Sequence, residues 1–199
     1  MAGSVRRMAT KAERRATLVR AAIDVIAEKG LSGTRVADIA ARAGISPGHV
    51  LYYFEGKSDI FTRALRTIED DLRAEALAAF EAMPSATERW DWLVEQAAPT
   101  GPGDARVLLW MEAWERAPRD PDVSALVIEL EGRWIALLID LLEYGRSRGE
   151  FALANPGDFA IRFSALMDGL TLQVAAGSPT LTRARMLEIC AQAAAELHG

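Results

Sequence analysis

The chain has 199 residues, 50% of them hydrophobic and 26% charged, with a formal net charge of −5, and this is enough to bury a full core. One cysteine excludes an internal disulfide, and two histidines far apart in the sequence make a metal site improbable, so no metal and no cofactor are expected. No signal peptide and no run of 18 apolar residues is present, which predicts a soluble cytoplasmic protein.

Charge is distributed unevenly along the chain. Residues 1–67 hold 12 Lys and Arg against 6 Asp and Glu, a balance of +6, whereas residues 68–199 hold 11 against 22, a balance of −11. A basic N-terminal part would be attracted to the phosphate backbone of DNA, and an acidic remainder would be repelled from it. The alternative is that the basic residues form only a solvated helix face.

In chain order, the first element expected is a helix that follows a short arm. Residues 1–9 include Arg6 and Arg7, and such arms can reach a groove or a phosphate. Thr10 and Glu13 have the spacing of a capping box, which predicts the start of a helix that runs to Gly30.

Residues 34–57 have the spacing of a helix-turn-helix. Val36, Ile39 and Ala40 form one apolar face of a short helix, and Thr34 is placed to cap its first turn. Gly44 then supplies the left-handed backbone that ends this helix and turns the chain.

A second short helix is expected over residues 47–53. Ser46 would be its N-cap, and Pro47 takes the first helical position, where its missing N–H costs nothing. The helix is too short and polar to bury much surface, and it carries small or hydrogen-bonding groups, namely Gly48, His49, Tyr52 and Tyr53. Such a helix suits a DNA major groove. The alternative is an ordinary helical corner inside an all-α domain.

This stretch resembles the tetracycline-repressor (TetR) family of bacterial regulators. The matching residues are Gly30, Thr34, Ile39-Ala40, Ala43-Gly44-Ile45-Ser46, Gly48, Tyr53-Phe54 and Lys57. Members often carry a phosphate-contacting Tyr where Leu51 stands, so the phosphate hydroxyls would here come from Tyr52 and Tyr53. The resemblance implies a DNA-binding domain over residues 1–56, a helical ligand-binding and dimerisation domain over 57–199, and recognition helices about one DNA turn apart.

The candidate DNA-binding residues fall into two roles. His49, Tyr52 and Arg35 would approach base edges, and the others would hold phosphates or shape the helix start. The full set is Thr34, Arg35, Ser46, Pro47, Gly48, His49, Tyr52, Tyr53 and Lys57.

The rest of the chain reads as six helices, which makes nine in all and predicts an all-α protein without strands. Apolar spacing predicts a helix over residues 57–80 of about 38 Å. Caps and breakers predict later helices that begin near residues 85, 104, 121, 155 and 182. The last two are apolar over more than one face, which predicts burial against a second copy in a homodimer.

The acidic part contains all five tryptophans, between residues 90 and 134. The pattern Trp110-x-Glu112-x-Trp114, and residues 165–170 with Gln173, resemble the betaine/choline-regulator branch of the family. An effector pocket is expected from Trp110, Trp114, Trp134, Phe163 and Met167, with Asp168 or Glu112 as polar anchor. It would suit an apolar or cationic small molecule. The alternative is that these aromatics are plain core and the carboxylates are solvated.

The combined expectation is a ligand-responsive repressor that binds a pseudo-palindromic operator as a dimer. The effector would shift the helix over residues 57–80 and must therefore bind the two states with different affinity. An enzyme is not expected, because no base or nucleophile with partners is apparent. The alternative function is a helical interaction protein with a structural helix-turn-helix and no small-molecule ligand.

Overall fold

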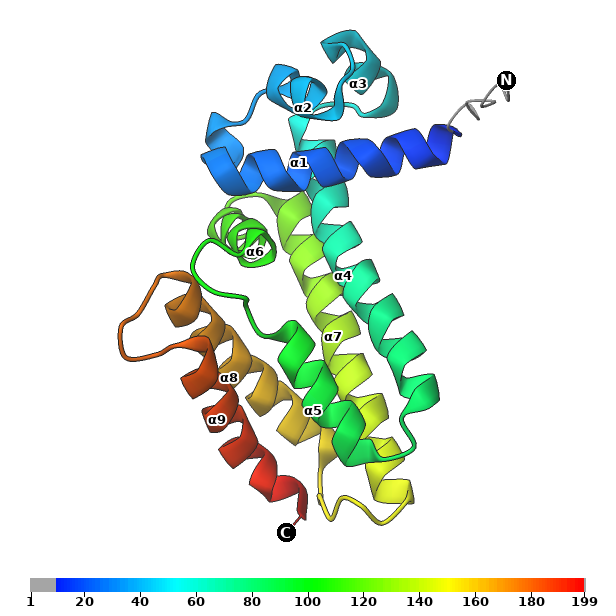
Figure 1. Ribbon diagram of the computed structural model, residues 1–199, viewed down its shortest axis with the longest axis vertical. Helices are drawn as coiled ribbons and strands as arrows, with labels where there is room; N and C mark the ends of the chain where they lie inside the picture. The colour runs from blue at the N-terminus through cyan, green and yellow to red at the C-terminus, as the bar shows by residue number, and fades with distance from the viewer. Residues whose placement is uncertain (1–9, 199) are drawn as a thin grey trace, which may run out of the picture. The chain divides into compact units, whose positions relative to one another are not determined.

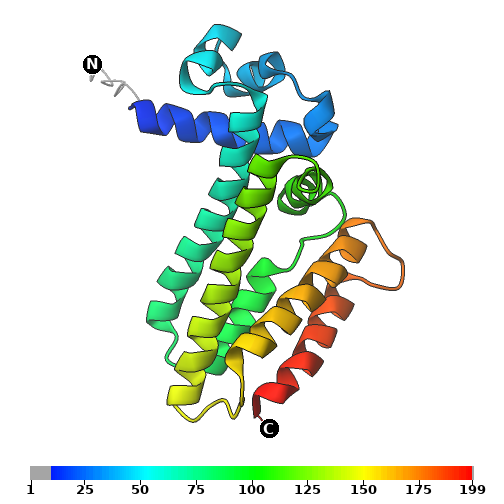
Figure 2. The same cartoon turned by 180° about the vertical axis from the view of Figure 1, so that it is seen from behind.

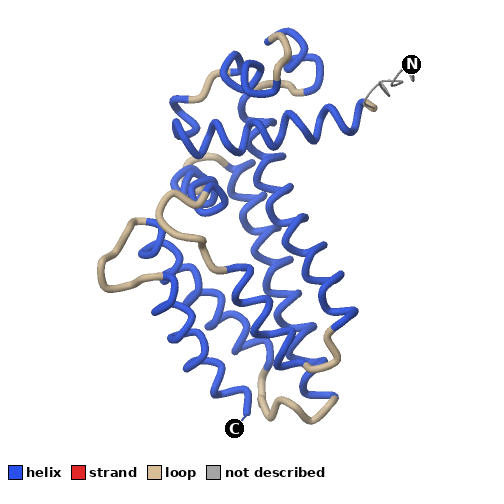
Figure 3. Tube along the Cα trace, viewed as in Figure 1, coloured by secondary structure: helices blue, strands red, loops and turns tan. Residues whose placement is uncertain are grey.

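The computed structural model describes residues 10–198, and this part of the chain consists of α-helices without strands, as the sequence predicted (Figures 1 and 3). The proposed arm with Arg6 and Arg7 lies outside the described residues. The helices are α1 (Lys11–Gly33), α2 (Val36–Ala43), α3 (Pro47–Tyr53), α4 (Lys57–Ala82), α5 (Ala86–Ala97), α6 (Ala105–Arg116), α7 (Pro121–Ser147), α8 (Pro156–Ala175) and α9 (Arg183–Ala194), followed by a short 3-10 turn (Ala195–His198).

The described chain forms two compact units, and their boundary falls inside helix α4, between Ala64 and Leu65. We call them unit 1 and unit 2. The domain limits expected at residues 56 and 57 stay a prediction. Helix α4 nevertheless starts at Lys57, as its sequence indicates.

Unit 1 is built around helix α1. The expected capping box at its start is present, since the Thr10 side chain accepts from the Glu13 N–H and the Glu13 carboxylate accepts from the Thr10 N–H. Near its other end the helix is interrupted at Gly30, where φ is 68°, a backbone region that glycine adopts without a Cβ clash. Helices α1 and α2 pack together, as do α2 and α3, around a fully buried core that includes Ile39, Val50 and Phe61.

Unit 2 contains the larger core, to which helices α5, α7, α8 and α9 contribute most of the buried side chains. Helix α8 lies between α7 and α9, which both views show (Figures 1 and 2). The segment after α7 is hydrogen-bonded to the start of α5. The Glu150 carboxylate accepts the Ala86 N–H at 2.7 Å and the Ser85 hydroxyl at 3.0 Å. None of the helices over residues 10–198 is both long and apolar enough to cross a bilayer.

Candidate DNA-binding surface and ligand cavity

The turn between α2 and α3 follows from two residues of the sequence. Gly44 adopts φ 69° and ψ 32°, the left-handed conformation expected for the residue that ends α2. Pro47 then occupies the first position of α3, as predicted. Val50 is completely buried and anchors α3 on the unit, which leaves Gly48 and His49 on its exposed side.

The structure corrects the predicted capping role of Thr34 and confirms the position of Ser46 as an N-cap. Thr34 is not the N-cap of α2: it ends α1, and its hydroxyl is buried and donates to the Gly30 carbonyl at 2.8 Å. The N-cap of α2 is Arg35, whose N–H donates to the Asp38 carboxylate. Ser46 is the N-cap of α3, but its hydroxyl makes no bond to the helix backbone. It lies 3.2 Å from His49 Nδ1 instead.

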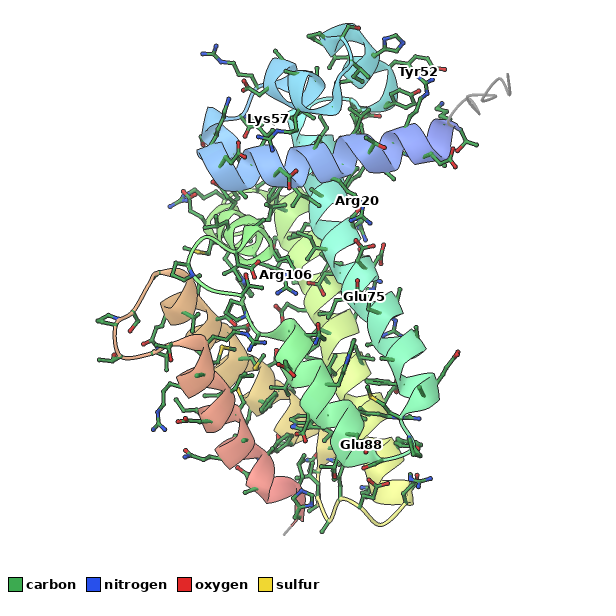
Figure 4. All side chains as sticks on the ribbon, viewed as in Figure 1. Arg20, Tyr52, Lys57, Glu75, Glu88 and Arg106 are labelled. Carbon is green, nitrogen blue, oxygen red and sulfur yellow. The ribbon has the colours of Figure 1, made fainter. Side chains whose placement is uncertain are left out.

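The aromatic end of α3 faces solvent. Tyr52 is 68% exposed and is labelled where it projects from α3 in Figure 4. Its ring stands edge-on to Tyr53, and the Lys11 amine lies 5.2 Å from its centre. Sequence reasoning did not single out Lys11, because its place beside α3 depends on how α1 and α3 pack. Leu51, at the position where Tyr is common, is also exposed.

Lys57 performs a structural task at the start of α4. Its amine donates to the carbonyl of Leu31 at 2.8 Å and lies 3.5 Å from that of Ser32, near the end of α1. A lysine has three donors, so this anchoring leaves donor capacity for a phosphate. The exposed candidates in unit 1 are therefore Arg35, Ser46, Pro47, Gly48, His49 and Tyr52, with Tyr53 and Lys57 partly buried.

Unit 2 contains a cavity of about 520 Å³ among α4, α6, α7 and α8, with one residue from α5. We call it the effector cavity. Its walls combine apolar side chains with a few polar groups, as small-molecule sites usually do. The predicted residues that line it are Trp110, Trp114, Trp134, Met167 and Asp168.

Two predicted pocket residues lie elsewhere. Phe163 belongs to the core, where its ring centre is 4.7 Å from that of Trp90 and it stacks on Phe159. Glu112 does not line the cavity. At 100° per residue, position 112 lies about 200° around the helix from Trp110, on the opposite side of α6 from the cavity.

Two carboxylates that sequence reasoning missed line the effector cavity. Glu69, on α4, accepts a hydrogen bond from Trp110 Nε1 at 2.9 Å, and burial raises its pKa. Glu131 lies on α7, where burial, and after it the charges of Asp168 and Glu69, raise its pKa from 4.5 to about 7. A signal existed for Glu131, because it lies four residues after Val127 and three before Trp134, on the apolar stripe of its helix.

Asp168 lies where the cavity opens. Its side chain is exposed on α8, yet the apolar wall beside it removes enough water to raise the pKa of this carboxyl. The cavity thus has three carboxylates, contributed by three different helices.

Among the described residues, Arg106 is the cationic side chain that lines the cavity, and Figure 4 labels it in unit 2. Its guanidinium lies 3.2 Å from the Asp104 carboxylate and donates to the carbonyls of Gln96 and Ala98. Arg133 is a second positive charge near Glu69, and it is paired with Asp70. Because each arginine has its own acidic partner, the three carboxylates leave the cavity negative when they are ionised. Together with the tryptophan rings, that potential favours an organic cation.

Comparison with known proteins agrees with this arrangement. Residues 18–64 match the family described as bacterial regulatory proteins, tetR family, and residues 86–199 match the family described as BetI-type transcriptional repressor, C-terminal. The HTH-type transcriptional regulator BetI of Escherichia coli strain K12 is 28% identical over 175 residues, which cover 86% of this chain and 87% of that protein. The regulator of the same name from Klebsiella pneumoniae strain 342 is 29% identical over 170 residues, with 83% and 85% covered.

Solved structures show the same relationship. A chain described as a transcriptional regulator of Saccharomonospora viridis, in complex with choline, superposes with a TM-score of 0.83 at 27% identity and covers 93% of this chain and 97% of its own. A TetR-family chain from Rhodococcus sp. gives a TM-score of 0.77 at 25% identity, with 92% and 98% covered. The chain belongs to the TetR family of bacterial transcriptional regulators, and its C-terminal part is that of the BetI-type repressors.

Proposed function

We propose that this regulator represses transcription by binding operator DNA as a homodimer and that an organic cation in the effector cavity releases it. The observation that carries the proposal is the cavity itself, which tryptophan rings and carboxylates line together. A tryptophan face attracts a cation through its quadrupole, and a nearby carboxylate adds a full charge. The choline complex of the Saccharomonospora viridis regulator supports a ligand with a quaternary ammonium head. A protein that binds chromosomal DNA in this way would act in the cytoplasm.

On the DNA side, α3 would enter the major groove with His49 and Tyr52 toward base edges, and Arg35 beside them. Ser46, Tyr53 and Lys57 would hold phosphates, as would Thr34 if its buried hydroxyl became accessible. Support comes from the exposure of α3 and from the match of this segment to the family. A helix held by one buried residue and otherwise open to solvent can lie in a groove without unfolding the unit.

Dimerisation would use the last two helices, α8 and α9. One large apolar side chain of α8 that does not line the cavity is exposed, Ile161 by 57%. A second copy that packs on this face of α8 would cover that side chain. A twofold pair would then present two α3 helices to the two halves of a pseudo-palindromic operator.

The proposed DNA-binding and ligand-binding sites both include residues of helix α4. Helix α4 is continuous from Lys57 to Ala82, so Lys57 stands in unit 1 and Glu69, a cavity wall residue, in unit 2. Glu69 follows Lys57 by twelve residues in the sequence of this helix. We propose that the dimer has a DNA-binding state and a released state, and that a ligand in contact with Glu69 has a different affinity for each. Such a ligand shifts the equilibrium toward the state that it binds more tightly.

The test is a titration of the purified protein against DNA that flanks its own coding region, at two salt concentrations, with a scrambled duplex as control. We expect salt-dependent binding that prefers the native duplex, and release of that duplex by choline. Trp110→Ala should keep DNA binding and lose the response to choline, whereas Trp92→Ala, which removes a tryptophan outside the cavity wall, should keep both.

Other results would assign a different role. Preferential DNA binding that no organic cation reverses would refute the effector assignment. Equal affinity for native and scrambled DNA at both salts would favour a helical interaction protein whose helix-turn-helix is structural.

A further inference from the structure

We propose that the effector cavity is built for an organic dication, with one positive centre held inside by Glu69 and Glu131 and the other at the opening by Asp168. This inference rests on the proposed function, because it specifies the ligand of the same cavity. It goes further than a choline-like ligand, which carries a single positive charge. The argument depends on where the carboxylates lie, on their number, and on the size of the cavity.

The inner end of the cavity joins two carboxylates to an aromatic wall. Glu69 and Glu131 are both partly buried. One oxygen of Glu69 accepts the Trp110 indole N–H, which fixes the carboxylate against the ring and leaves its second oxygen for another donor or cation. Trp134, which lies on α7 three residues after Glu131, also lines the cavity. An alkylammonium group here would meet both charge and ring faces.

The opening of the cavity also has a carboxylate together with a tryptophan, here on exposed residues. Asp168 is exposed on α8, and Trp114 is 45% exposed on α6, while both line the cavity. Leu172, also 45% exposed, and Met111 add apolar surface at the opening. A second ammonium group could therefore lie between a carboxylate and a tryptophan in contact with water, while the chain that links it to the first passes along apolar wall.

The positions of the charges favour two positive centres over one. The charges of Asp168 and Glu69 act on Glu131, and the charges of Arg133 and then Arg106 act on Glu69. Helix α5 contributes only Ala97 to the cavity wall. Arg106 is already paired with Asp104. A single cation held by Glu69 and Glu131 would leave the Asp168 carboxylate at the opening without a cation. Without a ligand, Glu131 relieves part of this repulsion by keeping its proton to near pH 7. A dication would replace that proton.

The volume is consistent with a two-headed ligand. At roughly 30 Å³ for each heavy atom, the share of one molecule in liquid water, about 520 Å³ holds roughly 17 heavy atoms. A single small quaternary ammonium head would fill less than half of that space. Two such heads joined by a six-carbon chain match it more closely.

The experiment compares hexamethonium, with two trimethylammonium groups on a six-carbon chain, with hexyltrimethylammonium, which has the same chain and one group. Affinity is measured by isothermal titration calorimetry on the full-length protein at pH 7.5, and choline is titrated in parallel. We expect hexamethonium to bind at least about tenfold more tightly than its matched monocation, a factor that corresponds to ~1.4 kcal/mol. Calorimetry in two buffers of different ionisation enthalpy should show proton release with the dication.

Variants locate the second charge. Asp168→Asn should reduce the ratio of the two affinities toward one and leave the affinity for hexyltrimethylammonium nearly unchanged. Asp158→Asn, on the same helix but outside the cavity wall, should leave the ratio as in the wild type. Circular dichroism and DNA binding of each variant confirm that it is folded.

The outcomes separate the two proposals. If choline and hexyltrimethylammonium bind as tightly as hexamethonium, the cavity is a monocation site, and the dication inference is wrong while the proposed function stands. If none of the three cations binds, both fail. A preference for hexamethonium that Asp168→Asn leaves intact would also overturn the assignment of the outer centre.

Discussion

Replacement of Glu131 by Gln should stabilise this protein at alkaline pH and leave its stability nearly unchanged at acid pH. Glu131 is the cavity carboxyl whose pKa is raised to about 7 by burial and by the neighbouring charges of Asp168 and Glu69. Its ionisation therefore costs more in the folded than in the unfolded protein. Gln has nearly the same shape and never ionises, so the variant avoids that cost.

The sign and the size follow from linkage. A raised pKa in the folded state means that the contribution of Glu131 is fully present below its ordinary value of 4.5 and is lost as pH rises through about 7. At 1.36 kcal/mol for each pH unit, the difference amounts to ~3 kcal/mol above pH 7. The carboxyl is only partly buried, and screening by solvent reduces the expected effect to ~1–2 kcal/mol.

The assay is urea denaturation of wild type and Glu131→Gln from pH 5 to pH 8.5, at one protein concentration because dimerisation couples stability to concentration. The free energy of unfolding of the variant minus that of the wild type should rise by ~1–2 kcal/mol across this range. Groups that titrate alike in both proteins cancel in this difference. A difference independent of pH would refute the account of Glu131, and a difference that falls with pH would reverse its sign.

Three further predictions concern other parts of the chain. Gly145→Ala should destabilise the protein by ~1–3 kcal/mol in thermal denaturation, because a Cβ at this position would overlap the Phe151 ring. Gly132 is the matched control on the same helix: it is exposed and has open space around it, so Gly132→Ala should stabilise the protein by up to ~1 kcal/mol. Glu150→Gln should lower the melting temperature at pH 7. The difference in melting temperature between this variant and the wild type should disappear as pH falls from about 5 toward 2. The reason is that hydrogen bonds, first from Arg148 and then from the start of α5, hold the pKa of Glu150 at about 2. His49→Ala should alter base preference in a selection from randomised duplexes, and an unchanged consensus would remove His49 from base readout.

Much of the fold could be predicted because its signals are local. Thr10 with Glu13 starts α1, Pro47 starts α3, and Asn155 starts α8 by accepting the Asp158 N–H. A cap or a proline acts on its own turn, so the sequence alone is sufficient to place it. Thr34 shows the limit of such reasoning: the same hydroxyl could serve the end of one helix or the start of the next, and tertiary packing placed it at the end of α1.

The cavity was predicted less completely because it depends on which face each helix turns inward. Trp110 and Trp114 share a face, and that much follows from their spacing of four residues. On α8 both Phe163 and Met167 are buried and one helical turn apart, but Phe163 packs into the core and only Met167 reaches the cavity. Periodicity identifies a buried face and does not say whether a ligand or another side chain fills the space beside it.

The carboxylates that define the ligand were the hardest part to predict, for a physical reason. Glu69 and Glu131 lie on α4 and α7, far apart in sequence, and only the packing of these helices brings both to one cavity. Two ion pairs join α4 to α7, and their α4 residues lie before and after Glu69 in the sequence. They are Arg66 with Glu129 and Asp70 with Arg133. Both pairs form in the register of α4 against α7 in which Glu69 and Glu131 line the cavity. A change in that register would move the cavity carboxylates and the course of α4 together, and a cation that binds both would favour one register over the other.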